Sequence, residues 1–178
     1  MRKALFILGQ LNDVDVEWLA HNGERRRLSA GEVIVREGEP LDALFITLNG
    51  QLAVTLRDGR QVAQLGVGEV VGEIAFVDSS PPSATVTALG DALVLSLAKA
   101  LLQRRLADDP AFAARFYRAL AIFLADRLRA TTRRLGYGGR GDLDSDAILE
   151  DEIDIGVLDT VSQAGERFTR LLQTLLTG

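Results

Sequence analysis

The sequence contains no cysteine and only one histidine, His21, among its 178 residues. Disulfides, thiol nucleophiles and thiolate metal sites are therefore excluded, and so is a metal site built from several histidines. No apolar run reaches the roughly 18 residues that cross a bilayer. The apolar run that follows Met1-Arg2-Lys3 is too short for a signal peptide. We therefore expect a cytoplasmic protein without a membrane partner.

Positive charge is also limited, since the formal net charge is −5. Residues 1–135 contain 17 Lys or Arg against 16 Asp or Glu (net +1), whereas residues 136–178 contain 3 against 9 (net −6). Non-specific nucleic-acid binding needs Lys and Arg to neutralise phosphates, so this balance argues against DNA as a partner. Hydrophobic residues make up 47% of the chain, which is enough to build an ordinary core.

Glycines separate short runs of Val, Ile, Leu and Thr throughout residues 28–98, a pattern typical of a small sandwich or barrel. In residues 51–57, apolar and polar or small residues alternate with the period of a strand. The Asp58-Gly59 pair that follows predicts a type I′ hairpin turn, with positive φ at both residues. Residues 92–97 alternate similarly, which places Leu93, Leu95 and Leu97 on one face.

Helical periodicity begins after Lys99. Residues 99–107 predict a short helix, which Asp108-Asp109-Pro110 ends before a second helix starts. Residues 111–135 lack Gly and Pro and predict a helix of about 37 Å. Its apolar residues recur at spacings of three and four: Phe112, Phe116, Leu120, Phe123, Leu124, Leu128 and Leu135. Such a helix is longer than a small barrel, so we expect a homodimer through residues 111–135.

The expected fold class is mainly β with α, a small antiparallel β-barrel of the double-stranded β-helix or jelly-roll type flanked by helices. Its expected parts are an N-terminal helical segment (1–27), the barrel (28–98), the short and long helices (99–135), a flexible acidic linker (136–154) and a C-terminal amphipathic helix (155–178). Asp142, Asp144 and Asp146 resemble a calcium loop. Ala147 and Ile153 stand at its Gly and Glu positions, so we interpret the linker as a solvated acidic segment. The last helix is expected to pack on its own domain or on the partner subunit.

The stretch from Gly68 to Ala88 carries the chemistry. A Gly72-Glu73 pair precedes a short apolar turn, and a segment of small residues follows it. Small residues let a ligand approach the backbone, and successive N–H groups at a helical turn favour an anion. A lone carboxylate beside them can accept hydrogen bonds from sugar hydroxyls. The pattern suits a sugar phosphate.

This stretch resembles the phosphate-binding cassette of the cyclic-nucleotide-binding domain family, which runs Gly-Glu-apolar-Ala/Gly, a short helix, then Pro-Arg-small-Ala-Thr-Val. The matching residues are Gly72, Glu73, Ile74, Ala75, Pro81, Pro82, Ser83, Ala84, Thr85 and Val86. The resemblance covers about residues 25–136 and implies cyclic AMP or cyclic GMP as ligand, with no cofactor. It also implies a set of base-lining residues: Val62, Leu65, Val71 and Val86.

By the same resemblance, Glu73 holds the ribose 2′-hydroxyl. The amides of Ala75, Ser83 and Ala84, with the Ser83 hydroxyl, face the cyclic phosphate. Thr131 and Thr132 match two hydroxyl residues that contact adenine from the family's dimer helix, although Thr at these positions equally suits a solvent-facing helix surface.

One departure concerns the phosphate, because the family's phosphate-binding Arg aligns with Pro82. That Arg makes a charge-assisted contact, so its loss costs about 1.5–3 kcal/mol, or roughly tenfold to a hundredfold in affinity. Arg57, Arg60 or the Arg-rich helix 111–135 reach the site only if the fold brings them there.

The sequence thus predicts a non-enzymatic, homodimeric sensor of cyclic AMP or cyclic GMP that signals to an unknown downstream protein. The 42 residues after Gly136 contain no basic recognition helix, so we expect no DNA-binding domain. No nucleophile–base pair or metal cluster indicates an enzyme, and Glu69 is interpreted as a turn residue. The alternative, favoured by Pro82, is a degenerate barrel that has lost nucleotide binding and serves as a dimeric interaction scaffold.

Overall fold

The computed structural model describes residues 9–137, 165–167, 169–171 and 173. The elements in chain order are α2 (Asp13–Asn22), β1 (Glu24–Leu28), β2 (Val33–Val35), β3 (Ala43–Asn49), β4 (Leu52–Thr55), β5 (Gln61–Leu65), β6 (Val70–Val71), α3 (Glu73–Asp78), β7 (Thr85–Ala88), β8 (Ala92–Ala98), α4 (Lys99–Asp108) and α5 (Pro110–Tyr137). Strand β1 begins four residues before the expected barrel boundary. Its Glu24 and three arginines are exposed, so the strand carries no alternating apolar signal.

Eight strands form two four-stranded antiparallel sheets, in the orders β1-β8-β3-β6 and β2-β7-β4-β5. The prediction of a mainly β fold with flanking helices is confirmed, but the two sheets are not joined into a closed barrel. Loops that contain Gly31 (φ 82°) and Gly68 (φ 84°) carry the chain from one sheet to the other. Each of these loops breaks the hydrogen-bonded ladder, because the chain leaves one sheet there and enters the opposite one.

The turn between β4 and β5 differs from the predicted type I′ hairpin. Leu56 donates its N–H to the Arg60 carbonyl (3.0 Å), which leaves a three-residue loop. Gly59 alone in this loop has positive φ (83°), as in a turn that ends in a left-handed glycine. The Asp58 carboxylate accepts the Arg60 N–H (2.9 Å), a local bond that favours this longer loop over a two-residue turn.

Strand β8 is buried on both faces and separates two hydrophobic clusters. Leu95 and Leu97 face a cluster shared with the helices, whereas Val94 faces a cluster between the two sheets. The predicted alternation of this strand is confirmed. Its central position explains why apolar residues occupy both faces, since a hydrophobic cluster covers each face.

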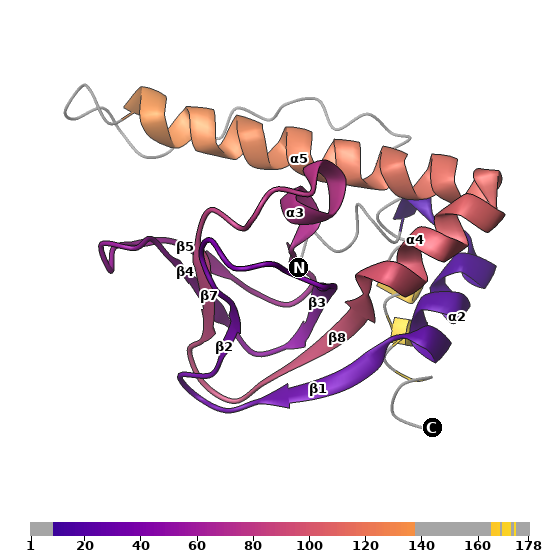
Figure 1. The fold of residues 1–178 in the computed structure, drawn as a ribbon, viewed down its shortest axis with the longest axis horizontal. Helices are drawn as coiled ribbons and strands as arrows, with labels where there is room; N and C mark the ends of the chain where they lie inside the picture. Colours follow the sequence, from indigo (N-terminus) through magenta and orange to yellow (C-terminus); the bar gives the residue numbers. More distant parts are fainter. Residues whose placement is uncertain (1–8, 138–164, 168, 172, 174–178) are drawn as a thin grey trace.

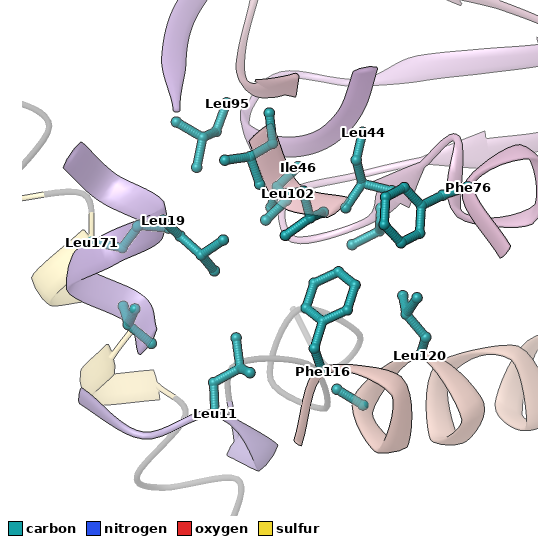
Figure 2. Close-up of a cluster of buried hydrophobic side chains, with 14 of the residues drawn as sticks. Leu11, Leu19, Leu44, Ile46, Phe76, Leu95, Leu102, Phe116, Leu120 and Leu171 are labelled. Carbon is teal, nitrogen blue, oxygen red and sulfur yellow. The ribbon is translucent and has the colours of Figure 1, made fainter. Parts of the chain in front are cut away.

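The helices pack on the outer face of the β1-β8-β3-β6 sheet, and α5 runs the length of the molecule above α3 (Figure 1). The predicted boundary between α4 and α5 is confirmed, and Asp109 caps α5 by accepting the Phe112 N–H (2.9 Å). Four predicted stripe residues of α5 are nearly inaccessible: Phe112, Phe116, Leu120 and Phe123. Figure 2 shows Phe116 and Leu120 directed toward Leu44 and Phe76. Further along the same helix, Leu128 is 68% exposed.

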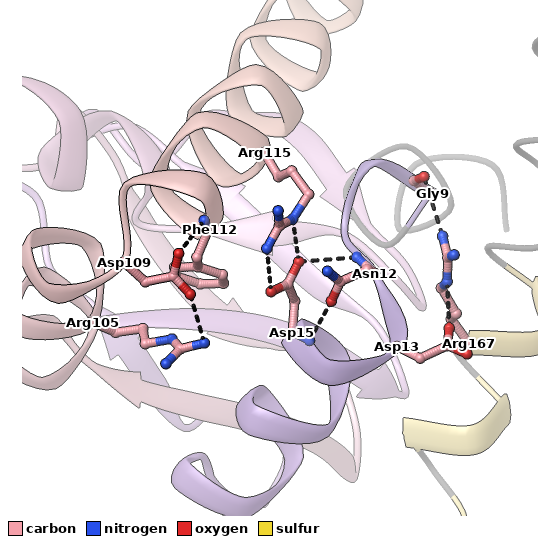
Figure 3. A network of polar contacts seen from close by, with 9 residues as sticks. All are labelled: Gly9, Asn12, Asp13, Asp15, Arg105, Asp109, Phe112, Arg115 and Arg167. Atoms are coloured by element: carbon pink, nitrogen blue, oxygen red, sulfur yellow. Dashed lines mark hydrogen bonds and ion pairs between the residues drawn. The ribbon is translucent and has the colours of Figure 1, made fainter.

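A polar network fixes α2 against α5 (Figure 3). The Asp15 carboxylate is buried and accepts hydrogen bonds from Arg115 Nε (2.6 Å) and Nη2 (2.9 Å). It also accepts the Asn12 N–H (3.0 Å), while the Asn12 side chain accepts the Asp15 N–H (2.9 Å). This reciprocal capping box starts α2, and the bidentate ion pair sets its position on α5.

The described part of the C-terminal segment lies against α2 of the same chain. Arg167 Nε and Arg170 Nη1 donate to the Asp13 carboxylate (2.9 and 2.8 Å), and Leu171 is buried among the helices. The arginine contacts hold the pKa of the Asp13 carboxyl below its ordinary value. The described residues of this segment contact the chain's own domain, and packing on a partner subunit stays a prediction. Helix α5 also extends to Tyr137, two residues into the expected linker.

Replacing Asp15 by Ala is expected to lower the free energy of unfolding by about 1.5–3 kcal/mol, the scale of a hydrogen bond to a charged group. The change leaves the Arg115 guanidinium without its carboxylate partner and removes the capping box of α2. Urea denaturation measures the effect. The matched control is Glu17→Ala, an exposed position on the same helix, which should change the free energy by less than about 0.5 kcal/mol. Equal effects of the two changes would contradict this role for Asp15.

Candidate functional site

A pocket of about 580 Å³ lies where the β2-β7-β4-β5 sheet, α3 and α5 meet. Its volume falls within the range of small-molecule sites, and most of its lining is apolar, as such sites usually are. The residues that line it are Val35, Val54, Leu56, Val62, Ala63, Gln64, Leu65, Val71, Gly72, Glu73, Ile74, Ala75, Pro82, Ser83, Ala84, Val86, Arg127 and Thr131. Ten residues were predicted to bind the ligand, and eight of them line this pocket: Gly72, Glu73, Ile74, Ala75, Pro82, Ser83, Ala84 and Thr131. The other two, Thr85 and Thr132, lie outside the lining, whereas all four predicted base-lining residues are in it.

Gly72 is required by its surroundings. It has φ of 91°, and a Cβ built on it would lie 2.7 Å from Leu41 Cδ2 and 3.0 Å from the Ala43 carbonyl. Only glycine fits such a left-handed conformation at this close approach. The tight turn allows α3 to begin at the next residue, and it places the Glu73 side chain in the pocket wall.

The Glu73 side chain is only 3% exposed, and its partner is Arg127 from α5. Arg127 Nη1 donates to Glu73 Oε1, and the guanidinium lies over the Phe123 ring, 5.3 Å from its centroid. This contact joins α3 to α5 across the pocket. The sequence contains a signal for Arg127, because it precedes Thr131 by one helical turn and so shares its face. The helix carries six Arg, however, and the sequence does not distinguish among them.

Burial raises the pKa of the Glu73 carboxyl above its ordinary value, because the ionised form loses its hydration. The Arg127 guanidinium opposes this shift, and the Glu69 carboxylate adds to it. Glu69 is itself buried. The charge on Glu73 therefore depends on the cation that α5 supplies.

The segment after α3 is held by its main chain. Gly38 donates its N–H to the Pro82 carbonyl (2.8 Å), so Pro82 anchors this segment to the loop after β2. Ser83 and Ala84 line the pocket. Thr85 lies outside the lining, since its hydroxyl accepts the Glu37 N–H (3.1 Å) and ties β7 to the same loop.

The two threonines of α5 differ in position. Thr131 lines the pocket, whereas Thr132 lies outside the lining. Their hydroxyls donate to the carbonyls one turn back, Thr131 to Arg127 (2.9 Å) and Thr132 to Leu128 (3.0 Å). Both side chains are exposed. The oxygen lone pairs of Thr131 remain available to a ligand donor.

The sequence offered three possible sources of positive charge near the site: Arg57, Arg60 and the Arg-rich helix. The structure shows which of them reaches the pocket. Arg57 pairs with Glu37 (3.5 Å) and Arg60 with Asp58 (3.8 Å), both away from the pocket. Arg127 is the cationic side chain of the lining, among the residues the structure describes. The Arg-rich helix therefore reaches the site through Arg127.

Across residues 9–137 and the described part of the C-terminal segment, no group of three His, Asp or Glu is arranged to hold a metal ion. No helix in the same part is long and apolar enough to span a membrane. The acidic stretch 142–154, with its partial resemblance to a calcium loop, lies outside the described residues.

Comparison with known proteins confirms the resemblance to a known family. The family model of the cyclic nucleotide-binding domain matches residues 25–109, from β1 to the end of α4. A crystal structure of a cyclic nucleotide-binding domain from Methylobacillus flagellatus has the same fold, with a TM-score of 0.70 at 23% identity over 80% of this chain and 85% of that one.

Two relatives from Mycobacterium tuberculosis are longer proteins than this chain. An uncharacterized NTE family protein is 29% identical over 140 residues, which are 76% of this chain and 24% of that protein. A CRP-like cAMP-activated global transcriptional regulator is 29% identical over 109 residues, or 59% of this chain and 47% of the regulator. The chain thus spans from about a quarter to about half of the length of these relatives.

The raised pKa of Glu73 predicts a particular pH dependence. A raised folded-state pKa contributes stability that is fully present below the ordinary value of 4.5 and is lost as pH rises through the folded-state pKa. The free energy of unfolding of the wild type, relative to Glu73→Gln, should therefore decrease as pH rises above the ordinary value of 4.5. Urea denaturation at several pH values measures it.

Glu32→Gln provides a control of opposite sign. Hydrogen bonding by the Ser29 N–H, and then by Arg26, lowers the pKa of the Glu32 carboxyl. The contribution of Glu32 to stability is therefore present above the ordinary carboxyl pKa of 4.5 and is lost as pH falls. Slopes of the same sign for the two variants would contradict the assignment of a raised pKa to Glu73.

Proposed function

We propose that this chain is a regulatory domain that senses a cyclic mononucleotide, cyclic AMP or cyclic GMP, in the pocket between the sheet and α5. The observation that carries the proposal is the buried Glu73 carboxylate in the wall of a mostly apolar, ligand-sized pocket. A buried carboxylate is costly unless polar groups contact it. A ribose hydroxyl is a donor of the right kind, and the apolar lining is suited to a purine ring.

The proposed roles follow the residues of the lining. Glu73 accepts the ribose 2′-hydroxyl, and the backbone of Ala75, Ser83 and Ala84 faces the cyclic phosphate. Thr131 contacts the base from α5. Because Glu73 and Thr131 lie on different elements, the ligand bridges the cassette and α5, and its differential affinity for two positions of α5 shifts their equilibrium.

The output we propose is a changed surface of α5, presented to a downstream protein in the cytoplasm. A regulatory role of this kind requires neither catalysis nor DNA binding by the chain. It requires that α5 be free to respond, and the exposure of Leu128 is consistent with an end of α5 that is not packed on its own domain.

We also propose that α5 pairs with α5 of a second copy. Tyr117, Ala121, Leu124 and Leu128 follow one another at spacings of four, three and four, which is the repeat of a coiled-coil seam. Tyr117 is 48% exposed and Leu128 is 68% exposed. A parallel or antiparallel partner helix would cover this stripe.

Calorimetry with cyclic AMP and cyclic GMP tests the sensor proposal. We expect the wild type to bind one of them, and Glu73→Ala to weaken that binding by at least about tenfold, since a hydrogen bond to a charged group is lost. Glu39→Ala, an exposed glutamate outside the lining, should bind as the wild type does. Absence of binding to both nucleotides would overturn the proposal and favour the alternative, a dimeric scaffold that has lost nucleotide binding.

Light scattering coupled to size exclusion tests the dimer. We expect a dimeric wild type and a monomeric Leu128→Asp variant, because a buried aspartate in the seam is left without a partner. The control is Val14→Asp, since Val14 is 64% exposed on α2 rather than α5. A monomeric wild type, or a dimer that survives Leu128→Asp, would show that this stripe is not the interface.

A further inference from the structure

The proposed site must accommodate an anion, although its cassette carries no cation. A cyclic mononucleotide bears one negative charge, and Glu73 adds a second within the same pocket. Position 82 holds a proline, which offers neither a charge nor an N–H. Among the described residues that line the pocket, Arg127 is the one basic side chain. The positive charge of the pocket therefore comes from α5.

The position of Arg127 suits it to a second acceptor. Its contact with Glu73 runs through Nη1, and a guanidinium carries five N–H donors in a planar fork. Phe123, which is 1% exposed, supports one face of this plane. The Arg127 side chain is itself 28% exposed and borders the pocket. The fork can thus hold Glu73 and still present donors to the pocket.

The chemistry of the ligand brings its phosphate to this fork. In a 3′,5′-cyclic nucleotide, the 2′-hydroxyl and the 3′-oxygen of the phosphate ring are on adjacent carbons. A ligand whose 2′-hydroxyl is held by Glu73 therefore places its phosphate beside the group that Glu73 already contacts. Planar guanidinium forks bind phosphate oxygens well, often through two parallel hydrogen bonds.

We propose that Arg127 is the phosphate-binding cation of this site, so that α5, rather than the cassette, holds the charge of a cyclic nucleotide. This inference rests on the proposed function. It names a ligand contact on α5 in addition to Thr131, and it makes the phosphate itself the link between pocket occupancy and helix position. A ligand without the phosphate would fill the pocket without recruiting Arg127.

The test compares two ligands that differ only in the phosphate. Cyclic AMP is titrated by calorimetry and adenosine by ligand-observed NMR, against the wild type, Arg127→Gln and Arg129→Gln. Arg129 is exposed on the same helix and lies outside the pocket lining. We expect Arg127→Gln to weaken cyclic AMP binding about tenfold to a hundredfold. Adenosine binding should change by less than about threefold, or about 0.7 kcal/mol, and Arg129→Gln should have no effect on either ligand.

A second variant separates loss of charge from damage to the fold. Adding Pro82→Arg to Arg127→Gln returns a cation from the cassette side, and it should restore cyclic AMP binding if the phosphate is what Arg127 contacts. An equal loss of cyclic AMP and adenosine in Arg127→Gln would overturn the inference, because Arg127 would then act only by positioning Glu73. A wild type that binds neither cyclic AMP nor cyclic GMP would instead overturn the proposed function, and this inference with it.

Discussion

The ion pair between Glu73 and Arg127 is the contact on which the organisation of the site depends. Gly72, a left-handed glycine that tolerates no side chain, fixes the backbone from which the buried Glu73 carboxylate extends into the pocket wall. A cation must come to it, and the cation comes from the long helix. The cassette and α5 are therefore joined by one ion pair in a mostly apolar pocket, where electrostatic interactions are stronger than in water.

A basic residue in the cassette would bind phosphate without involving α5. With Pro82 in that position, the phosphate contact that we propose and the Glu73 contact both depend on one helix. The main chain of Pro82 still has a structural use, since its carbonyl fixes the loop after β2. Pro82 thus contributes through its backbone, whereas Arg127 of α5 brings positive charge to the pocket lining.

Most of the fold and much of the site follow from local patterns in the sequence. The alternation of residues along 92–97 predicted β8, and the Asp109-Pro110 pair predicted the start of α5. The cassette residues converge because the turn at Gly72 starts α3 and the Pro82 carbonyl anchors the segment that follows. Local patterns do not predict which residues of separate elements come into contact. Arg127 is one of six arginines on its helix, and only the packing of Phe112, Phe116 and Phe123 determines which of them reaches Glu73. Strand β1 was not predicted because its arginines are exposed and do not alternate with apolar residues. It lies at the edge of its sheet, where charged residues are common.

The aromatic residues along the first half of α5 have a mechanical consequence. They clamp the helix to the domain as far as Phe123, after which Leu124 is only half-buried and Leu128 is exposed. The remaining turns to Tyr137 form a lever arm of roughly 20 Å at 1.5 Å per residue. A tilt of about 10° at the pivot would displace its tip by roughly 3–4 Å. Arg127 lies one turn beyond Phe123, so a small change in its contact with Glu73 would be amplified at the far end of the helix.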